Sequence, residues 1–171
     1  MKRKIALAFL LLVMGAIGYL GFSIYEELEQ KQRVKERISQ LPSFSLATLG
    51  GKTIHSEKNS GQIPVIITYF NTECEYCRAE INSMKGHQAL QEKAHIYLVS
   101  NEPLEKLEAF SSSFGLDSLS AIQILRDTQG EVKELFGVKG VPNTFVYDED
   151  RKLLKNFKGE TKAEVLYGSV R

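Results

Sequence analysis

The sequence is poor in the residues that build metal sites and covalent scaffolds. Its 171 residues include two cysteines, three histidines and no tryptophan. Two cysteines exclude a scaffold of several disulfides and a structural zinc site made mainly of cysteine. The three histidines, His55, His87 and His95, lack the paired spacing of zinc ligands. We therefore expect neither a bound metal nor another cofactor.

The chain also lacks the net charge that would attract a nucleic acid. Its formal net charge is +1, and Lys2, Arg3 and Lys4 form a basic cluster at the amino terminus. In the rest of the chain acidic residues outnumber basic ones. DNA or RNA binding is not expected, because it requires a basic surface. Apolar residues make up 43% of the chain and charged residues 25%, which is typical of a folded globular protein.

One long apolar run is present, over residues 5–22, and it contains no charged residue. As a helix it would extend roughly 27 Å, close to the roughly 30 Å of a bilayer core. The basic cluster before it predicts a cytoplasmic amino terminus and an exported, periplasmic or otherwise extracytoplasmic remainder. A cleaved signal peptide is the alternative, but its apolar part usually has about 7–15 residues. We expect residues 1–22 to be an uncleaved, single-pass membrane anchor.

The segment that follows, residues 23–41, is rich in glutamate, lysine, arginine and glutamine. Glu27 precedes Lys31 by four residues and Glu29 precedes Arg33 by four, a spacing that favours a helix. Pro42 would end this helix. Residues 23–41 are therefore expected to form a helical stalk.

Residues 42–171 alternate between strand and helix patterns and should form one domain. Strands are expected over residues 44–46 and 54 (a hairpin), 64–70, 95–100, 122–125, 144–147 and 153–157, and helices over 75–93, 104–114, 130–136 and 161–167. Thr161 and Glu164 predict a capping box at the start of the last helix. The alternation predicts an α/β fold with a mixed central sheet flanked by helices and an N-terminal hairpin.

The chemistry is concentrated in the segment from Cys74 to Cys77, which follows a predicted buried strand and opens a predicted helix. The helix dipole and the unpaired N–H groups at a helix start stabilise a thiolate, the reactive form of cysteine. Cys77 lies one turn further on and within disulfide reach. Cys74 should therefore attack a disulfide and Cys77 should resolve the mixed intermediate. A c-type haem site would need histidine where Arg78 stands, and a structural disulfide here would constrain almost no loop.

Three segments together resemble the TlpA/ResA-like group of membrane-anchored, thioredoxin-like thiol–disulfide oxidoreductases. They are PSFSLATLGGKTI at 42–54, ITYFNTECEYCRAE at 67–80 and GVKGVPNTFVYDED at 137–150. The resemblance covers residues 42–171 and implies a thioredoxin-like fold with Cys74 and Cys77 as the redox-active pair.

The resemblance also implies roles for residues around the pair. Pro142 would have a cis peptide bond and pack beside the cysteines, and the backbone of Val141 would hydrogen-bond an extended substrate. We assign Tyr76, between the cysteines, to the same substrate surface. Glu80 matches the acidic residue of the C-x-x-C-x-x-E pattern and would accept or relay a proton. The alternative for Glu80 is an ordinary exposed helix glutamate.

The sequence departs from the group at three places. Glu73 replaces the usual tryptophan before the first cysteine, Tyr76 replaces a common proline, and Thr68 stands where thioredoxin has a buried aspartate. Glu73 and Glu75 flank Cys74, and their carboxylates should oppose a Cys74 thiolate. We therefore expect a reductant, with a potential nearer the thioredoxin value of about −270 mV than the DsbA value of about −120 mV.

By the same resemblance, the expected partners are thiol or disulfide groups of exported proteins, apocytochrome c among them. An integral-membrane thiol carrier would supply electrons. Two other functions stay open from the sequence. One is copper delivery by a Sco-like protein, although that group uses C-x-x-x-C with a distant histidine, and the other is a thioredoxin-like module that binds proteins without catalysis.

Overall fold

The structure is a computed structural model that describes residues 2–56 and 63–170, with side chains from residue 12 onward. Its contacts divide the chain into two compact units, Met1–Glu36 and Arg37–Arg171.

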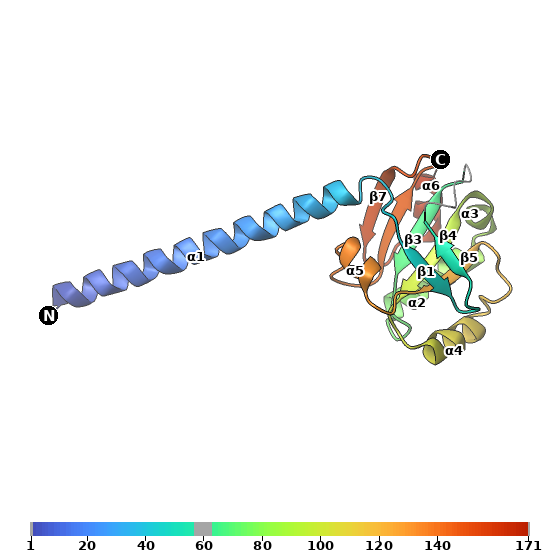
Figure 1. Cartoon of the computed structure of the whole chain (residues 1–171), viewed down its shortest axis with the longest axis horizontal. Helices are drawn as coiled ribbons and strands as arrows, with labels where there is room; N and C mark the ends of the chain where they lie inside the picture. The colour runs from blue at the N-terminus through green and yellow to red at the C-terminus, as the bar shows by residue number, and fades with distance from the viewer. Residues whose placement is uncertain (1, 57–62, 171) are drawn as a thin grey trace. The chain divides into compact units, whose positions relative to one another are not determined.

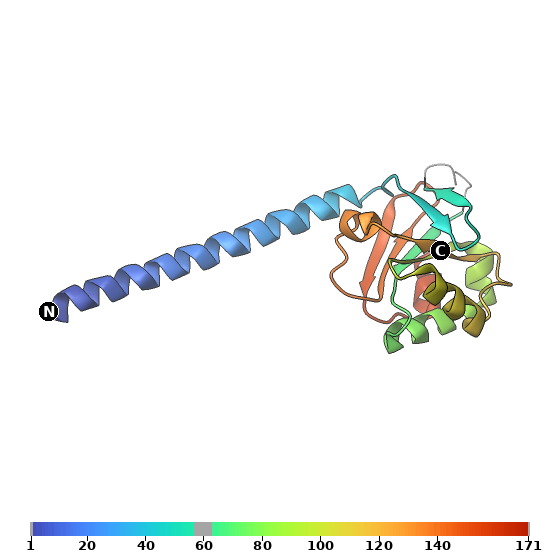
Figure 2. The same cartoon turned by 60° about the horizontal axis from the view of Figure 1, so that its bottom comes forward.

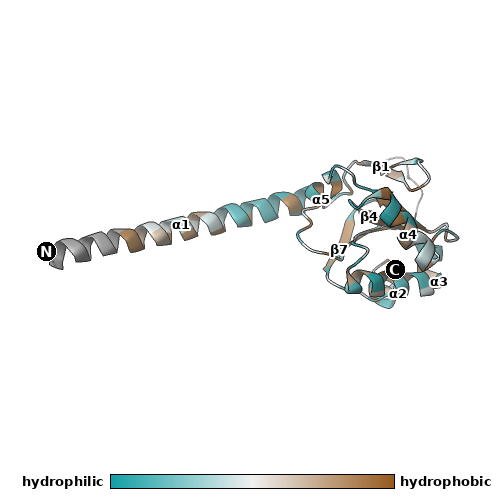
Figure 3. Cartoon of the chain, turned by 90° about the horizontal axis from the view of Figure 1, so that it is seen from below, coloured by the Kyte–Doolittle hydropathy of each residue, from teal (hydrophilic) through white to brown (hydrophobic). Residues whose placement is uncertain are grey.

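A single helix, α1 (Lys2–Arg37), runs through the segments expected as anchor and stalk. The predicted i,i+4 pairs are present, with 3.0 Å between Lys31 and Glu27 and 2.9 Å between Arg33 and Glu29. Figure 3 shows the carboxyl-terminal part of α1 as mostly hydrophilic. The first part of the apolar run at 5–22, up to residue 11, has side chains that lie outside the described residues. Among the residues that are described, no helix is both long enough and apolar enough to cross a bilayer.

The second unit is built on one mixed sheet with the strand order β2-β1-β5-β4-β3-β6-β7. Its strands are β1 (Ser45–Thr48), β2 (Thr53–His55), β3 (Val65–Tyr69), β4 (His95–Ser100), β5 (Ile122–Arg126), β6 (Asn143–Tyr147) and β7 (Leu153–Lys158). Strands β3, β4 and β5 run parallel, and the other pairs are antiparallel. All five residues of β3 are buried, as its continuous apolar and β-branched run predicts. The expected mixed sheet and N-terminal hairpin are confirmed.

Helices cover both faces of this sheet (Figures 1 and 2). They are α2 (Glu75–Gly86), α3 (Gln88–Lys93), α4 (Leu104–Phe114), α5 (Glu131–Leu135) and α6 (Ala163–Ser169). Buried residues of α2, α3, α4 and α6 form one core with alternate residues of the central strands, such as Ile66 and Leu98. On the opposite face, Phe136 at the end of α5 packs edge-on against Phe145, with 4.8 Å between ring centroids. The inner strands of the sheet are thereby buried on both sides, and β3 lies among them between β4 and β6.

The single helix expected over 75–93 is wrong. Helix α2 ends at Gly86, and the backbone of His87 (φ −107°, ψ 83°) is not helical. The Nδ1 atom of His87 accepts the N–H of Leu90 at 3.1 Å and so caps α3. Buried residues of both helices face the same core. Their spacing along the sequence therefore resembles that of one continuous helix and does not indicate the interruption at His87.

The compact domain begins at Arg37, earlier than the expected boundary at Pro42. Ile38 is buried, and its carbonyl accepts a hydrogen bond from the Tyr147 hydroxyl at 3.0 Å. The residues just before Pro42 therefore belong to the packed domain.

The capping box predicted at Thr161 is also wrong. Helix α6 begins at Ala163, and its cap residue, Lys162, makes no side-chain capping bond. The N–H of Thr161 instead donates to the Glu80 carboxylate at 3.0 Å. Thr161 is thus a partner of α2, in the region of the cysteines.

Candidate active site

The turn between β3 and α2 positions Cys74. Cys74 is the N-cap residue of α2, with an extended backbone (φ −75°, ψ 115°). Its Sγ atom accepts the N–H of Cys77 at 3.4 Å, and its own N–H donates to the Asn71 carbonyl at 3.3 Å. The sulfur therefore occupies the place of a capping oxygen, at the positive end of the helix dipole.

The two thiols have different surroundings. Both are free, but Cys74 is half-buried whereas Cys77 is fully buried. Burial, with further contributions from the hydrogen bond to Cys74 and the charge of Glu80, raises the pKa of Cys77 to about 12. Cys77 therefore stays a thiol at neutral pH unless a nearby base takes its proton, and Cys74 is the thiol that a substrate can reach.

The loop before β6 brings Val141 and Pro142 to Cys74. The Val141–Pro142 peptide bond is cis, as the resemblance implied. The Cys74 Sγ atom lies 3.8 Å from the Val141 carbonyl, to which the thiol donates. Pro142 is buried and Val141 is half-buried. Tyr76 lies in the first turn of α2, two residues after Cys74, with 65% of its surface exposed.

Glu80 is fully buried, so the alternative of an exposed helix glutamate is wrong. Its carboxylate accepts hydrogen bonds from the Thr144 hydroxyl and the Thr161 N–H. Burial raises the pKa of Glu80 to about 7, and these two hydrogen bonds limit the rise. The hydroxyls of Thr68 and Thr144 are 2.8 Å apart, so Thr68 extends the chain of hydrogen bonds that ends at Glu80.

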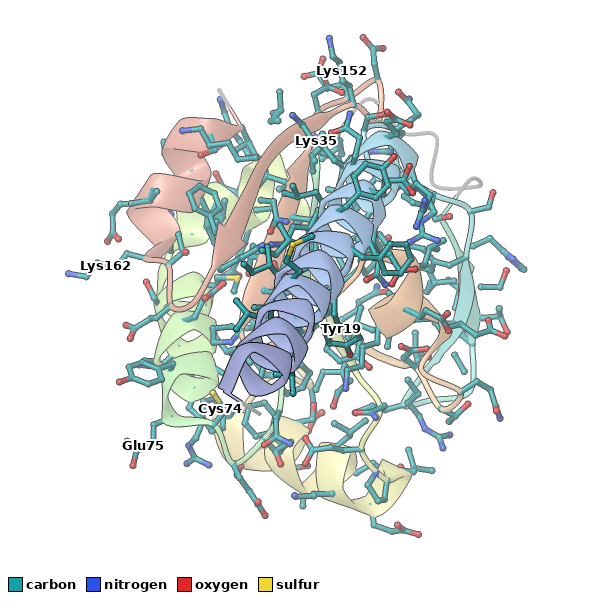
Figure 4. The ribbon with its side chains drawn as sticks, turned by 90° about the vertical axis from the view of Figure 1, so that its left-hand side faces the viewer. Tyr19, Lys35, Cys74, Glu75, Lys152 and Lys162 are labelled. Atoms are coloured by element: carbon teal, nitrogen blue, oxygen red, sulfur yellow. The ribbon has the colours of Figure 1, made fainter. Side chains whose placement is uncertain are left out.

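Glu73 has a partner that the sequence analysis missed. Its carboxylate lies 2.9 Å from the Lys106 ammonium on α4, and the same ammonium lies 2.7 Å from Glu102. The spacing of Glu102 and Lys106, four residues apart, was a signal for their pairing, but nothing in the sequence placed them beside Glu73. Glu75 is exposed on the first turn of α2 (Figure 4). Within the described part of the chain, Glu75 forms no ion pair.

Glu102 is 8% exposed and holds the loop before Cys74. Its carboxylate accepts the N–H of Thr72 at 2.7 Å and the Thr72 hydroxyl at 3.0 Å. Burial alone would raise the pKa of Glu102, but the hydrogen bonds from Lys106 and Thr72 outweigh it and hold the pKa below its ordinary value. Arg78 supports the same loop, since its guanidinium donates to the Thr72 carbonyl at 3.4 Å.

Comparisons with known proteins agree with this geometry. Residues 39–155 match the model of the AhpC/TSA family. The chain is 30% identical over 148 residues to the thioredoxin-like protein YneN of Bacillus subtilis (strain 168), covering 84% of this chain and 83% of that protein. It is 27% identical over 169 residues to the thiol-disulfide oxidoreductase ResA of Bacillus thuringiensis subsp. konkukian (strain 97-27), covering 97% and 95%.

Solved structures show the same fold. StoA from Bacillus subtilis aligns with a TM-score of 0.61 and 19% identity, over 77% of this chain and 98% of that one. The structure of MTB dsbF, in mixed oxidized and reduced forms, aligns with a TM-score of 0.64 and 19% identity, over 78% and 93%. The expected thioredoxin-like fold is confirmed.

Proposed function

The chain belongs to the AhpC/TSA family and is an enzyme, a thiol–disulfide oxidoreductase; from this premise we propose that it reduces disulfides of exported proteins through Cys74 and Cys77. The observation that carries the proposal is the unequal environment of the two thiols. Cys74 caps α2, half-buried, beside Val141, whereas Cys77 is fully buried one turn behind it. One thiol can meet a substrate and the other can act only within the enzyme.

The reaction proceeds in two exchanges. The Cys74 thiolate attacks one sulfur of the substrate disulfide, and a bond forms between them while the second substrate sulfur leaves as a thiolate and takes a proton. Cys77 then loses its proton and attacks the Cys74 sulfur, which releases the remaining substrate sulfur as a thiol. The substrate gains the electron pair and two protons, and the enzyme is left with a Cys74–Cys77 disulfide. A dithiol in an integral-membrane electron carrier would reduce it again.

Glu80 is the proposed acceptor of the Cys77 proton. A thiol with a pKa of about 12 is a poor nucleophile at neutral pH, whereas a carboxylate with a pKa of about 7 exchanges protons readily there. General bases work best when their pKa is near the working pH. Glu80 follows Cys77 by three residues on the buried face of α2, and it can pass the proton on to the departing substrate sulfur.

An extended substrate segment would bind across Val141 and Tyr76. The Val141 carbonyl lies 3.8 Å from the Cys74 sulfur, and Tyr76, two residues after Cys74, offers an exposed aromatic ring as apolar surface. We propose an extracytoplasmic location, with residues 5–22 as the membrane anchor. A reporter that is active only in the cytoplasm should be inactive when it is fused after Arg171. An active fusion would contradict this topology.

The direction of the reaction is proposed as reduction. The support is the exposed Glu75, the next residue after Cys74, because a nearby carboxylate opposes a thiolate and a less stable thiolate makes a dithiol more reducing. The pairing of Glu73 with Lys106 removes part of the acidic influence expected from the sequence. Equilibration with glutathione measures the potential directly, and a value more oxidising than about −150 mV would indicate a disulfide donor instead.

Two single substitutions test the proposed function. Cys74→Ser should abolish reduction of a model protein disulfide such as that of insulin. Cys77→Ser should retain the first exchange and accumulate mixed disulfides, visible as a mass increase that reductant removes. If Cys77 alone reacts with a bulky alkylating reagent in the folded, reduced enzyme, the assignment of roles is wrong.

A further inference from the structure

Lys106 joins the residue that precedes the reactive cysteine to a buried carboxylate on another part of the fold. Its ammonium lies 2.9 Å from Glu73 and 2.7 Å from Glu102. The Lys106 side chain is 38% exposed and that of Glu102 only 8%. One end of the bridge is therefore fixed in the protein, and the other reaches the exposed Glu73 carboxylate.

The fixed end also holds the loop itself. Glu102 accepts both the N–H and the hydroxyl of Thr72. The next residue, Glu73, donates its N–H to the Asn71 side chain at 2.9 Å. Thr72 and Glu73 thus contact the same Glu102–Lys106 pair, immediately before the cap residue Cys74.

We propose that Lys106 is a positioning residue of the dithiol site, which compensates the Glu73 carboxylate and thereby sets the reactivity and the redox equilibrium of Cys74. The proposal deepens the proposed function, because it rests on Cys74 being the attacking thiol. Within the described residues, the ion-pair partners of Lys106 are Glu73 and Glu102, and Lys106 therefore acts on Cys74 through Glu73.

The charges around Cys74 determine whether loss of Lys106 stabilises or destabilises the Cys74 thiolate. Glu73 and Glu75 are acidic neighbours in sequence, and Arg78 is the cation nearest to Cys74 in the sequence of α2, where it contacts the Thr72 carbonyl. Like charges disfavour a thiolate and opposite charges favour it. Without Lys106, the Glu73 carboxylate would lose its counter-ion and disfavour the Cys74 thiolate. The enzyme would become slower toward disulfides and alkylating reagents, and more reducing.

The test removes the charges of Lys106 and Glu73 in the full chain, first that of Lys106 alone and then both together. At about pH 7, Lys106→Gln should lower the rate of Cys74 alkylation about threefold, the order expected for one unit charge at a partly exposed site. Lys106→Arg should keep the wild-type rate. Glu73→Gln, introduced into the Lys106→Gln background, should restore it, because the uncompensated carboxylate is then gone. The equilibrium with glutathione should be measured at about pH 9, where an ordinary cysteine is largely ionised. It should shift toward the enzyme disulfide in Lys106→Gln and return in the double variant.

The chain offers a matched control. Lys152 precedes β7 at the end of the sheet remote from Pro142, and Figure 4 shows Lys152 and Cys74 at opposite sides of the domain. Lys152→Gln removes the same charge and should leave the rate and the equilibrium unchanged. Thermal unfolding of each variant separates loss of fold from loss of charge.

Two outcomes would overturn the proposal. The first is a Lys106→Gln enzyme with wild-type rate and equilibrium. The second is a slow Lys106→Gln enzyme that Glu73→Gln does not restore, which would assign the effect to the unpaired Glu102 or to the fold rather than to Glu73. Failure of the proposed function looks different, because alkylation would then persist in Cys74→Ser whatever stands at position 106.

Discussion

Glu80 and Glu102 are both buried glutamates near the cysteine pair, yet their surroundings give them opposite properties. Glu80 receives its hydrogen bonds from neutral donors, Thr144 and Thr161, and burial raises its pKa to about 7. Glu102 faces the Lys106 ammonium, and its pKa lies below the ordinary range despite burial.

The difference shows how one residue type serves two purposes. A buried carboxylate without a counter-ion can change its protonation state near neutral pH, which suits proton transfer. A buried carboxylate with a counter-ion remains charged, which suits the permanent support of a loop. Glutamine substitutions at the two positions should therefore have opposite consequences.

The largest expected effect is on the second exchange. Glu80→Gln removes the proposed acceptor of the Cys77 proton, so closure of the Cys74–Cys77 disulfide should slow about a hundredfold, the lower range for loss of a general base. In the wild type this rate should rise as the pH passes through about 7. Rapid-quench measurement of closure from a preformed mixed disulfide checks both. A Glu80→Gln profile that still rises through this range would assign the titration to another group.

The next effect is on stability as a function of pH. Because the pKa of Glu80 is raised from 4.5 to about 7 in the folded protein, its contribution is fully present below 4.5 and is lost as the pH rises through about 7. A shift of this size corresponds to about 3 kcal/mol of unfolding free energy. Urea unfolding at acid and alkaline pH should show the loss in the wild type and not in Glu80→Gln, so the variant should be the more stable protein at alkaline pH. Equal pH dependence of the two proteins would contradict the burial of an ionisable Glu80.

Glu102→Gln should act in the opposite direction. It removes charge-assisted hydrogen bonds to Lys106 and Thr72 and should lower the unfolding free energy at neutral pH by about 2 kcal/mol. The lowered pKa of Glu102 means that its stabilisation is present above the ordinary carboxyl pKa and is lost as the pH falls below it. The wild type and the variant should therefore converge in acid. A stabilised Glu102→Gln protein would remove the contrast between the two carboxylates.

The smallest expected effect is at Thr68. Thr68→Val keeps the shape of a fully buried side chain but removes its hydroxyl from the Thr144–Glu80 chain. The loss of one buried hydrogen bond should cost about 1 kcal/mol of unfolding free energy. Thr68→Ser keeps the hydroxyl and is the control for it, although the lost methyl group brings a packing cost of its own. If Thr68→Val slows closure of the Cys74–Cys77 disulfide by more than the loss of unfolding free energy accounts for, Thr68 also takes part in the proton transfer through Glu80.

Local patterns were enough to predict the frame of the site. The apolar run of β3, followed within five residues by Cys74 and a helical pattern, predicted the buried strand, the turn and the place of Cys74 at the start of α2. The resemblance added the cis peptide bond before Pro142. These features depend on neighbouring residues or on one recognisable segment, and they can therefore be predicted from the sequence.

The features that the sequence did not reveal depend on contacts between distant segments. Glu80 is buried because Thr144 and Thr161, more than sixty positions away, supply its donors. Glu73 lies opposite Lys106 only because α4 passes beside the loop before α2. Thr161 was predicted as a helix cap for the same reason, because the local pattern does not indicate its hydrogen bond to Glu80 on α2.

The two outer strands of the sheet have a consequence for behaviour at high concentration. β2 has only three residues, and β7 carries Lys155 and Lys158 and pairs with β6 through an irregular register. Short, lysine-bearing and irregular margins discourage strand addition by another chain. Copies of the domain crowded together should therefore remain colloidally separate, with little tendency to grow shared sheets or fibrils.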